Sequence, residues 1–320
     1  MSRIRVCFLG TPSFAVTCLQ GLLDDPHFEV VGVVTQPDRP AGRKMVLTPS
    51  PVKILAQSYH LPVLSPESIN KDLILQDVQN WHAEIAVVVA FGQIVSQKFL
   101  DLFPLGCVNV HASVLPRWRG AAPIQRAIEA GDSETGVALQ KMVKALDAGD
   151  VLGIRKCALD HEITALELHD KLAVLGKDLL AVELMDYARG NLVPSPQDAS
   201  LVTYAKKIEK SEAQLNWQDS ARTLHAKIRA LTMGPGTWTS WQTKKLKINR
   251  SALSLQDQLT PTNRLPVGGV AEIHQEGLLV QTGTGLLRIL EVQPESRNRQ
   301  KAWDFAKTAQ LKVGDRFGEG

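Results

Sequence analysis

The sequence predicts an α/β fold in which a doubly wound, mostly parallel sheet is followed by a small β-barrel or sandwich. In the first half of the chain, apolar β-branched runs alternate with helical patterns, as they do in βαβ units. One run, Ala83–Ala90, is apolar throughout, as expected of a parallel strand covered on both faces. After Gly190, short strand-like runs alternate with glycine or proline turns, which is typical of a small all-β domain.

The elements of the first half follow from apolar periodicity. Strands are expected at Arg3–Leu9, Glu29–Thr35, Ala83–Ala90, Gly106–His111 and Gly136–Met142. Helices are expected where apolar residues recur at helical spacing, namely at Phe14, Cys18 and Leu22, over Val52–Tyr59, over Ala122–Ala130, and at Leu168, Leu172, Leu175 and Leu179. The last of these helices is expected to end near Gly190.

The composition of the chain changes after Gly190. Asn191–Ser200 contains two prolines and few apolar residues, as linkers do. We therefore expect a first domain over residues 1–190, a linker over 191–207 and a second domain over 208–320. The elements predicted for the second domain are a helix marked by Ala221, Leu224, Ile228 and Leu231, and strands at Trp238–Gln242, Lys245–Ile248, Gly269–Ile273, Leu278–Gln281 and Leu286–Val292.

Composition excludes several classes of protein. With 44% hydrophobic and 22% charged residues, the chain is neither a collagen, a coiled coil nor a disordered protein. No apolar stretch approaches the ~18 uninterrupted residues of a membrane span, and the strand-like start at Ile4 leaves no room for a secretory signal. The cysteines lack metal-type spacing, and they are Cys7, Cys18, Cys107 and Cys157. We expect reduced thiols in a cytoplasmic protein that contacts no membrane.

Charge is distributed unevenly along the chain. Up to Lys206 there are 19 Lys and Arg residues against 22 Asp and Glu residues, whereas from Lys207 there are 17 against 11. A basic second part is typical of a domain that binds a polyanion. Ordinary surface charge would give the same count, so composition leaves both interpretations open.

The segment Asn109-Val110-His111 is the first candidate site. Side chains alternate along a strand, so Asn109 and His111 point to the same side, and ligands of open α/β sheets bind beyond the carboxyl ends of strands. An amide beside an imidazole suits a reaction in which a carbonyl oxygen gains negative charge, because the amide donates to that oxygen and the imidazole donates or transfers a proton. A hydrogen-bonded histidine without a catalytic role is the alternative.

The second candidate is Asp147, in the segment Gly136–Asp150. A strand leads there into a turn in which Gly149 frees the backbone. An aspartate in this turn can orient an imidazole and stabilise its cationic form. Alternatively, Asp147 and Asp150 only form the turn.

The third candidate is the loop Thr35–Lys53. Four prolines stiffen it, and Arg39, Arg43 and Lys44 make its tip basic. Such a loop can contact phosphates or base edges of a nucleic acid. A solvated charged loop is the alternative interpretation.

Motifs for other chemistries are missing. The chain contains no Gly-x-Gly-x-x-Gly, no Gly-x-x-x-x-Gly-Lys-Ser/Thr and no Gly-x-Ser-x-Gly, and His161 and His169 have no zinc-type partners in the sequence. The chemistry expected is direct group transfer, without metal and without an obligatory covalent enzyme intermediate.

Asn109–Ile128, together with Thr35–Arg43, Pro49–Lys53 and Thr135–Asp150, resembles the methionyl-tRNA formyltransferases. The Asn-x-His strand and the Leu-Asp-x-Gly-Asp turn mark the folate-dependent formyltransferases as a whole, whereas LPRWRGAAPI and TQPDRPAGR point to the tRNA-acting branch. The resemblance implies a Rossmann-like first domain and an OB-like second barrel. It implies formyl transfer from 10-formyltetrahydrofolate to the amino group of methionine on initiator methionyl-tRNA, for translation initiation.

The resemblance also implies roles for individual residues. The family's catalytic residues correspond to Asn109, His111 and Asp147. Its folate pocket corresponds to Ala90, Phe91, Gly92, Ser113, Val114, Leu115 and Pro116. Its tRNA contacts correspond to Arg39, Arg43, Lys44 and Lys207. The implied partners are initiator methionyl-tRNA and the folate donor, with no metal and no membrane, and the expected state is a cytoplasmic monomer.

The chain departs from the family pattern in three places. Lys44-Met45-Val46 replaces a second glycine and paired lysines, so the loop carries less charge; Val114 replaces leucine; and Met233–Gly236 is an atypical form of a proline-rich turn. Rival interpretations are a formyltransferase acting on a small amine, a formyl-folate hydrolase and a non-catalytic RNA-binding protein. A small acceptor needs neither a basic barrel nor the Arg43 loop.

Overall fold

The computed structural model describes residues 3–42, 45–253 and 265–318. The chain forms two compact units that are not separated at a single point in the sequence. The N-terminal unit comprises Met1–Pro123, Glu134–Ala158 and His169–Ala205, and the C-terminal unit comprises Ile124–Ser133, Leu159–Leu168 and Lys206–Gly320. Two short segments that precede residue 190 thus join the C-terminal unit, and the domain boundaries predicted around residues 190 and 207 stay a prediction.

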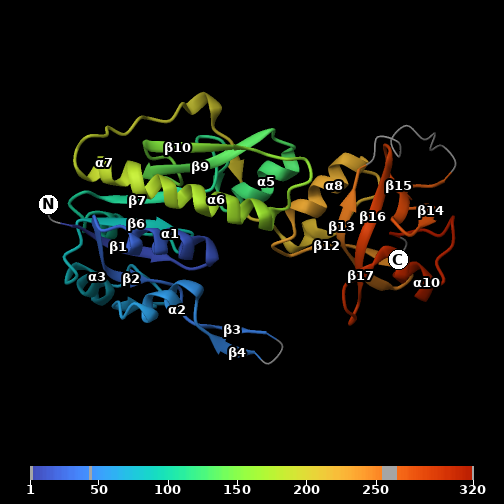
Figure 1. The fold of residues 1–320 in the computed structure, drawn as a ribbon, viewed down its shortest axis with the longest axis horizontal. Coiled ribbons are helices and arrows are strands. Elements are labelled where there is room, and N and C mark those ends of the chain that lie inside the picture. The colour runs from blue at the N-terminus through green and yellow to red at the C-terminus, as the bar shows by residue number, and fades with distance from the viewer. Residues whose placement is uncertain (1–2, 43–44, 254–264, 319–320) are drawn as a thin grey trace. The chain divides into compact units, whose positions relative to one another are not determined.

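A seven-stranded sheet forms the centre of the N-terminal unit (Figure 1). Its strands are β1 Ile4–Gly10, β2 Phe28–Val34, β5 Val63–Leu64, β6 Ile85–Val89, β7 Cys107–His111, β9 Glu134–Lys141 and β10 Val151–Ala158. They lie in the order β10-β9-β7-β6-β1-β2-β5. Strands β1, β2, β5, β6 and β7 run parallel, which confirms the predicted mostly parallel sheet. Strands β9 and β10 are antiparallel to their neighbours, and the sequence predicted neither this direction nor β10.

The middle of this sheet is held together by apolar side chains. All residues of β6 are buried, because β6 lies between β1 and β7 with both faces covered. Burying each Val or Ile stabilises the fold by about 1.5–3 kcal/mol. The fully apolar run from which this strand was predicted is therefore a consequence of its central position.

Helices flank the sheet of the N-terminal unit. Their bounds are α1 Ser13–Asp24, α2 Pro51–Ser58, α3 Asp72–Gln79, α4 Gln97–Leu100, α6 Ala165–Leu179 and α7 Met185–Ala188, with a π-helical turn at Leu180–Leu184 between the last two, whereas α5 Pro123–Ala130 falls almost entirely within the C-terminal unit. α6 packs closely on α1 and β7, since a Cβ added at Gly176 would lie 2.9 Å from Val110 Cγ1 and 3.3 Å from Cys18 Sγ. The predicted helices are confirmed, whereas α3 and α4 were not predicted.

The cysteines are free thiols, and three of them are buried. Cys7, Cys18 and Cys107 lie in the interior, and Cys157 is half-buried. Burial raises the pKa of Cys18 to about 12. A thiol that stays protonated is a poor nucleophile, so these residues serve packing.

The C-terminal unit is built on an antiparallel sheet. Its strands are β12 Thr237–Trp241, β13 Lys244–Ala252, β14 Val270–His274, β15 Gly277–Gln281, β16 Leu286–Pro294 and β17 Gln300–Lys301. They lie in the order β12-β13-β16-β15-β14, and β17 pairs with β16. The helices are α8 Ala221–Ala230 and α10 Ala302–Thr308, and a short 3-10 turn lies at Lys210–Ala213, whereas the 3-10 turn at Ala199–Leu201 belongs to the N-terminal unit. The five predicted strands and the predicted helix are confirmed, whereas β17 and α10 were not predicted.

His225 on α8 is a buried titratable group in this unit. Its Nδ1 lies 2.9 Å from Ser251 Oγ, and its Nε2 lies 3.4 Å from Glu162 Oε1. Burial, with the nearby positive charge of Arg229, lowers the pKa of His225 to about 4 despite the neighbouring carboxylate. The imidazole is therefore neutral in the folded protein at neutral pH.

Residues 195–205, within the predicted linker, are hydrogen-bonded to the N-terminal unit. Ser195 exchanges two backbone hydrogen bonds with Val151, of 2.7 and 2.9 Å. Strand β11, Tyr204–Ala205, pairs in parallel with β8, Arg119–Gly120. This part of the chain, called the 195–205 segment below, is thus an integral part of the N-terminal unit.

Candidate active site

The carboxyl end of β7 positions Asn109 and His111. Asn109 pairs across the sheet with Gln140 of β9, and His111 pairs with Ala138. Because side chains alternate along a strand, Asn109 and His111 face the same side. His111 is 6% exposed, and Asn109 is half-buried. The Asn109 amide has no hydrogen-bond partner among the described residues, so it can still donate to a ligand.

The ring of His111 is fixed by a backbone carbonyl. Its Nε2 lies 2.9 Å from the oxygen of Trp118. A carbonyl oxygen only accepts, so Nε2 carries a proton and donates it. Nδ1 is left as the nitrogen that can gain or lose a proton, and it lies 3.7 Å from Asp147 Oδ1. A proton taken up at Nδ1 would therefore face a carboxylate.

Both carboxylate oxygens of Asp147 are held by neutral donors. Gln140 Nε2 donates to Oδ1 at 2.9 Å, and the backbone N–H of Gly120 donates to Oδ2 at 2.9 Å. The distance of 3.7 Å to His111 is longer than a hydrogen bond. Asp147 is thus aimed at the imidazole by two other groups.

Two glycines permit this arrangement. A Cβ added at Gly149 would lie 1.6 Å from the carbonyl oxygen of Lys141, so the turn returns to β9 only with glycine at this position. Gly120 has a φ of +120°, and a Cβ there would lie 2.7 Å from the oxygen of Ala205. Side chains at either position would displace the backbone that presents or supports Asp147.

The structure brings together the three residues predicted to be catalytic. Asn109 pairs with Gln140, Gln140 bonds Asp147, and Asp147 faces His111. Sequence analysis missed Gln140, which is only 2% exposed. The signal was present in GVALQKM, where one amide interrupts an apolar strand, because a buried amide requires hydrogen-bond partners.

The residues predicted for the folate pocket follow β6 and β7. These strands are parallel neighbours, so the segments Ala90–Gly92 and Ser113–Pro116 lie at the same edge of the sheet. Phe91, Ser113 and Leu115 are almost fully buried. The residues left at least partly accessible are Ala90, Gly92, Val114 and Pro116. A ligand at this edge would contact the accessible residues directly, whereas the buried residues support the backbone.

Hydrogen bonds fix the strand end after β6. Thr11 Oγ1 and Gln36 Nε2 donate to the carbonyl oxygen of Phe91 at 2.9 and 3.2 Å. Ala90 and Gly92 adopt positive φ values of 46° and 86° on either side. The carbonyl of Phe91 is thus directed into the protein, and its neighbours are turned outward.

The residues predicted to contact tRNA lie in different parts of the chain. Arg39 belongs to β3, Arg39–Ala41, which pairs with β4, Val46–Thr48, in a hairpin that extends from the sheet of its unit (Figure 1). Its guanidinium forms an exposed ion pair of 3.3 Å with Glu67. Arg43 and Lys44 lie outside the described residues. Lys207 is exposed in the C-terminal unit.

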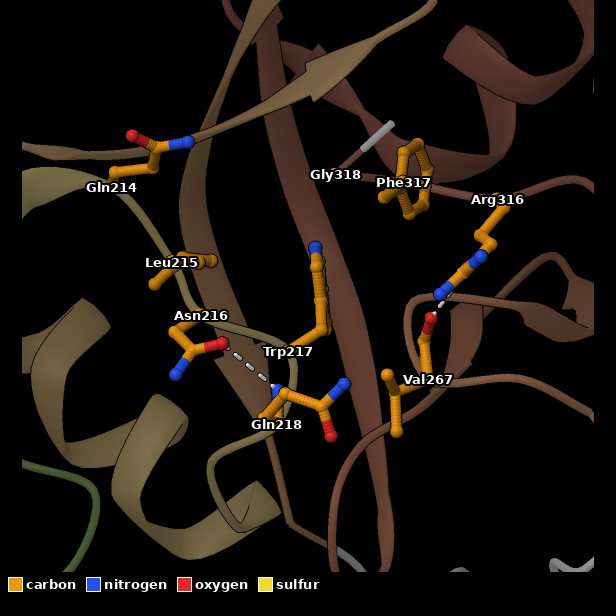
Figure 2. Close-up of a pocket in the computed structure, with 9 residues that line it drawn as sticks. All are labelled: Gln214, Leu215, Asn216, Trp217, Gln218, Val267, Arg316, Phe317 and Gly318. Carbon is orange, nitrogen blue, oxygen red and sulfur yellow. Dashed lines mark hydrogen bonds between the residues drawn. The ribbon is translucent and has the colours of Figure 1, made fainter. Parts of the chain in front are cut away.

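A hollow of about 350 Å³ lies in the C-terminal unit (Figure 2). Its lining residues are Gln214, Leu215, Asn216, Trp217, Gln218, Val267, Arg316, Phe317 and Gly318. Trp217 and Phe317 stack with ring centroids 6.0 Å apart and are 4% and 2% exposed. Their faces are therefore occupied by each other and by the core, so this hollow offers no aromatic surface on which a base could stack.

The described parts of the chain contain neither a metal-type cluster nor a membrane-spanning helix. No three or more His, Cys, Asp or Glu residues among them form a group that could hold a metal ion. Within the same residues, no helix has the length and apolar character needed to cross a membrane.

Comparison with known proteins identifies the family. Residues 2–184 match the formyl transferase family, and residues 207–310 match the formyl transferase C-terminal domain. The chain is 61% identical over 319 residues to the methionyl-tRNA formyltransferase of Bdellovibrio bacteriovorus, a match that covers 99% of this chain and 100% of the relative. It is 43% identical to that of Hydrogenovibrio crunogenus, over 96% of this chain and 97% of the relative.

Solved structures share the fold. An N-formyltransferase from Helicobacter canadensis, in complex with folinic acid and dTDP-3-aminofucose, superposes with a TM-score of 0.64 at 19% identity, over 89% of this chain and 99% of that one. HypX from Aquifex aeolicus, in complex with tetrahydrofolic acid, gives 0.63 at 16% identity, and this chain spans 48% of it. The matches to the family and to the near full-length relatives show that the chain belongs to the formyl transferase family, among the methionyl-tRNA formyltransferases.

Proposed function

We propose that the protein transfers the formyl group of 10-formyltetrahydrofolate to the amino group of methionine on initiator methionyl-tRNA, producing N-formylmethionyl-tRNA. The observation that carries this proposal is the convergence of the Asn109 amide, the His111 imidazole and the Asp147 carboxylate at the carboxyl edge of the sheet. The 61% identity to a methionyl-tRNA formyltransferase supports the choice of acceptor. A cytoplasmic monomer remains our expectation for its state in the cell.

Asn109 fits a carbonyl oxygen of the substrate. Its amide is half-buried, and it makes no hydrogen bond within the described residues. Bound 10-formyltetrahydrofolate supplies an electrophilic formyl carbon and a nitrogen leaving group. As the neutral methionine amine attacks that carbon, Asn109 donates to the formyl oxygen on which negative charge develops. One such donor accelerates a reaction by about 100–1,000-fold.

His111 handles the proton through Nδ1. Its Nε2 is committed to the carbonyl of Trp118, so only Nδ1 can accept the proton that the amine nitrogen loses on forming the new C–N bond. Asp147, 3.7 Å away, stabilises the imidazolium. The same proton is then delivered to the folate nitrogen as its bond to the formyl carbon breaks. Positioned proton transfer contributes about 100–10,000-fold.

The tRNA is proposed to contact the basic part of the chain from Lys207 onward and the β3–β4 hairpin. Lys207 contributes from the first and Arg39, Arg43 and Lys44 from the second. Met45, Val46 and Leu47 follow the basic residues and are exposed. Contacts of this kind position the acceptor end of the tRNA, since phosphate contacts set register and orientation.

The proposal is tested by offering one formyl-folate donor with three acceptors: initiator methionyl-tRNA, elongator methionyl-tRNA and small amines. We expect formylation of the initiator tRNA at a rate well above that of the others. Formylation of the small amines in preference to tRNA would replace the proposal with a small-molecule formyltransferase. Release of formate without any acceptor would indicate a hydrolase.

A further inference from the structure

We propose that Gln197 is a positioning residue for formyl transfer, which holds the turn that presents Asp147. The inference rests on the proposed function, in which Asp147 stabilises the charged form of His111. Gln197 lies in the 195–205 segment and comes from the predicted linker. No role was predicted for it from the sequence.

The side-chain amide of Gln197 is bonded at both ends. Its Nε2 donates to the carbonyl oxygens of Asp147 at 2.9 Å and Gly149 at 2.7 Å. Its Oε1 accepts from Nε of Arg119 at 3.0 Å and from Nη2 at 2.8 Å. A guanidinium only donates, so the oxygen must face Arg119 and the nitrogen must face the turn. The orientation of the amide is therefore fixed by chemistry.

The turn at Asp147 needs such support. Asp147 has a φ of +47°, in the left-handed region that is unfavourable for residues other than glycine, although Asn and Asp tolerate it better than most. Val143 and Leu146, just before it, are exposed and contribute little packing. Hydrogen bonds must therefore stabilise this backbone, and Gln197 supplies two of them on either side of Ala148.

The other end of Gln197 reaches the loop that anchors His111. Arg119 lies between Trp118, whose carbonyl accepts from His111 Nε2, and Gly120, whose N–H donates to Asp147 Oδ2. Thr203, from the same 195–205 segment, accepts from the backbone N–H of Trp118 through Oγ1 and from that of Arg119 through its carbonyl, each at 2.9 Å. One segment thus fixes the groups on both sides of the gap between His111 and Asp147.

The effect expected from losing Gln197 is on turnover. Small misplacement of a catalytic group by a distant substitution lowers rate by up to about 100-fold. We expect Gln197→Met, which keeps side-chain length and removes the polar atoms, to lower kcat about 10–100-fold with unchanged KM for donor and tRNA. Gln197→Glu keeps an acceptor for Arg119 and removes the donors to the turn, so it should lose turnover as Gln197→Met does.

A double-mutant cycle with Asp147 separates positioning from general loss of structure. In the Asp147→Ala protein, Gln197→Glu, which keeps the acceptor for Arg119, should change the single-turnover rate less than about 2-fold, because the carboxylate that the turn presents is already absent. Asp198→Ala is the matched control, since the Asp198 carboxylate accepts from Ser200 of its own segment. The control should turn over like the parent protein. Circular dichroism and thermal unfolding monitor folding of each variant.

The outcomes are distinguishable. If the parent protein formylates initiator methionyl-tRNA and Asp147→Ala lowers the single-turnover rate, but Gln197→Glu turns over normally, the inference is wrong and the proposed function stands. Equal losses from Gln197→Glu with and without the Asp147 carboxylate would also overturn it. If the parent protein does not formylate the tRNA at all, the proposed function fails and the inference falls with it.

Discussion

His111 Nδ1 lies 3.7 Å from Asp147 Oδ1, while Nε2 of the same ring donates to the carbonyl of Trp118 at 2.9 Å. The imidazole is therefore held at one nitrogen and open to protonation at the other. Once Nδ1 is protonated, the Asp147 carboxylate stabilises its positive charge. The arrangement supports a histidine that takes and returns one proton without rotating its ring.

Replacement of Asn109 by alanine should lower turnover about 100–1,000-fold, because it removes the donor to the developing negative charge. Binding of the folate donor should be retained, since the strand ends after β6 and β7 are untouched. Steady-state formylation and donor titration measure the two quantities. Asn80→Ala, at an exposed helix end, serves as the control. Near-normal turnover by Asn109→Ala would remove Asn109 from the mechanism.

Replacement of Gly149 by alanine should abolish turnover and destabilise the N-terminal unit by more than about 1 kcal/mol, since the added Cβ would overlap the carbonyl of Lys141. Gly190→Ala is a matched control: it has a φ of +77° and no neighbour within 4 Å of the added Cβ. It should cost about 1 kcal/mol of unfolding free energy from backbone strain alone and leave turnover intact. Equal behaviour of the two variants in activity and denaturation assays would contradict the geometry at Gly149.

Affinity for tRNA should fall steeply with salt, because phosphate contacts release counterions. If Lys207 makes one of these contacts, Lys207→Ala should weaken binding and reduce the slope of log affinity against log salt by about 0.7–0.9. Filter binding over about 50–200 mM salt provides the measurement. A flat salt titration of the parent protein would exclude the proposed role of the basic part of the chain from Lys207 onward. An unchanged slope in the variant would show that Lys207 contacts no phosphate of the tRNA.

Acid should destabilise the C-terminal unit through His225. Its pKa of about 4 in the folded protein lies below the unfolded value of 6.5. Between these values the unfolded chain binds a proton that the folded protein does not, so the free energy of unfolding falls as pH falls through this window. The full effect is on the order of 3 kcal/mol and is absent above the unfolded pKa.

Urea unfolding of the parent protein and of His225→Gln, at neutral pH and at about pH 4.5, measures this contribution. The loss of stability on acidification should be smaller in the variant. His60→Gln, an exposed histidine, should lose as much stability as the parent protein. Identical losses in all three proteins would show that His225 is protonated equally in the folded and unfolded states.

The sequence predicted most of the parallel sheet because its central strands have a purely local signature. Ile85–Val89 is apolar at every position, whatever its partners. The direction of β9 has no such signature, since it depends on pairing Val108 with Lys141. Strand β10 was missed because Arg155 and Lys156 interrupt its apolar pattern at a sheet edge.

Part of the candidate site was also predictable from the sequence, namely the residues that share one strand. Asn109 and His111 are two positions apart on one strand, so their common orientation follows from the strand period. Gln197 meets Asp147 from 50 residues away and bonds its backbone carbonyl. Backbone atoms leave no mark in a sequence, so no local motif indicates such a contact.

The pairing of β11 with β8 affects how the chain can be divided. Excising the catalytic half at the compositional break near Gly190 would remove Gln197, Thr203 and the strand that lies beside Arg119. A shortened enzyme for a small acceptor, whether engineered or arising by gene fission, must therefore retain the chain through Ala205. Residues 195–205 therefore contribute to the structure of the N-terminal unit as well as connecting it to the C-terminal unit.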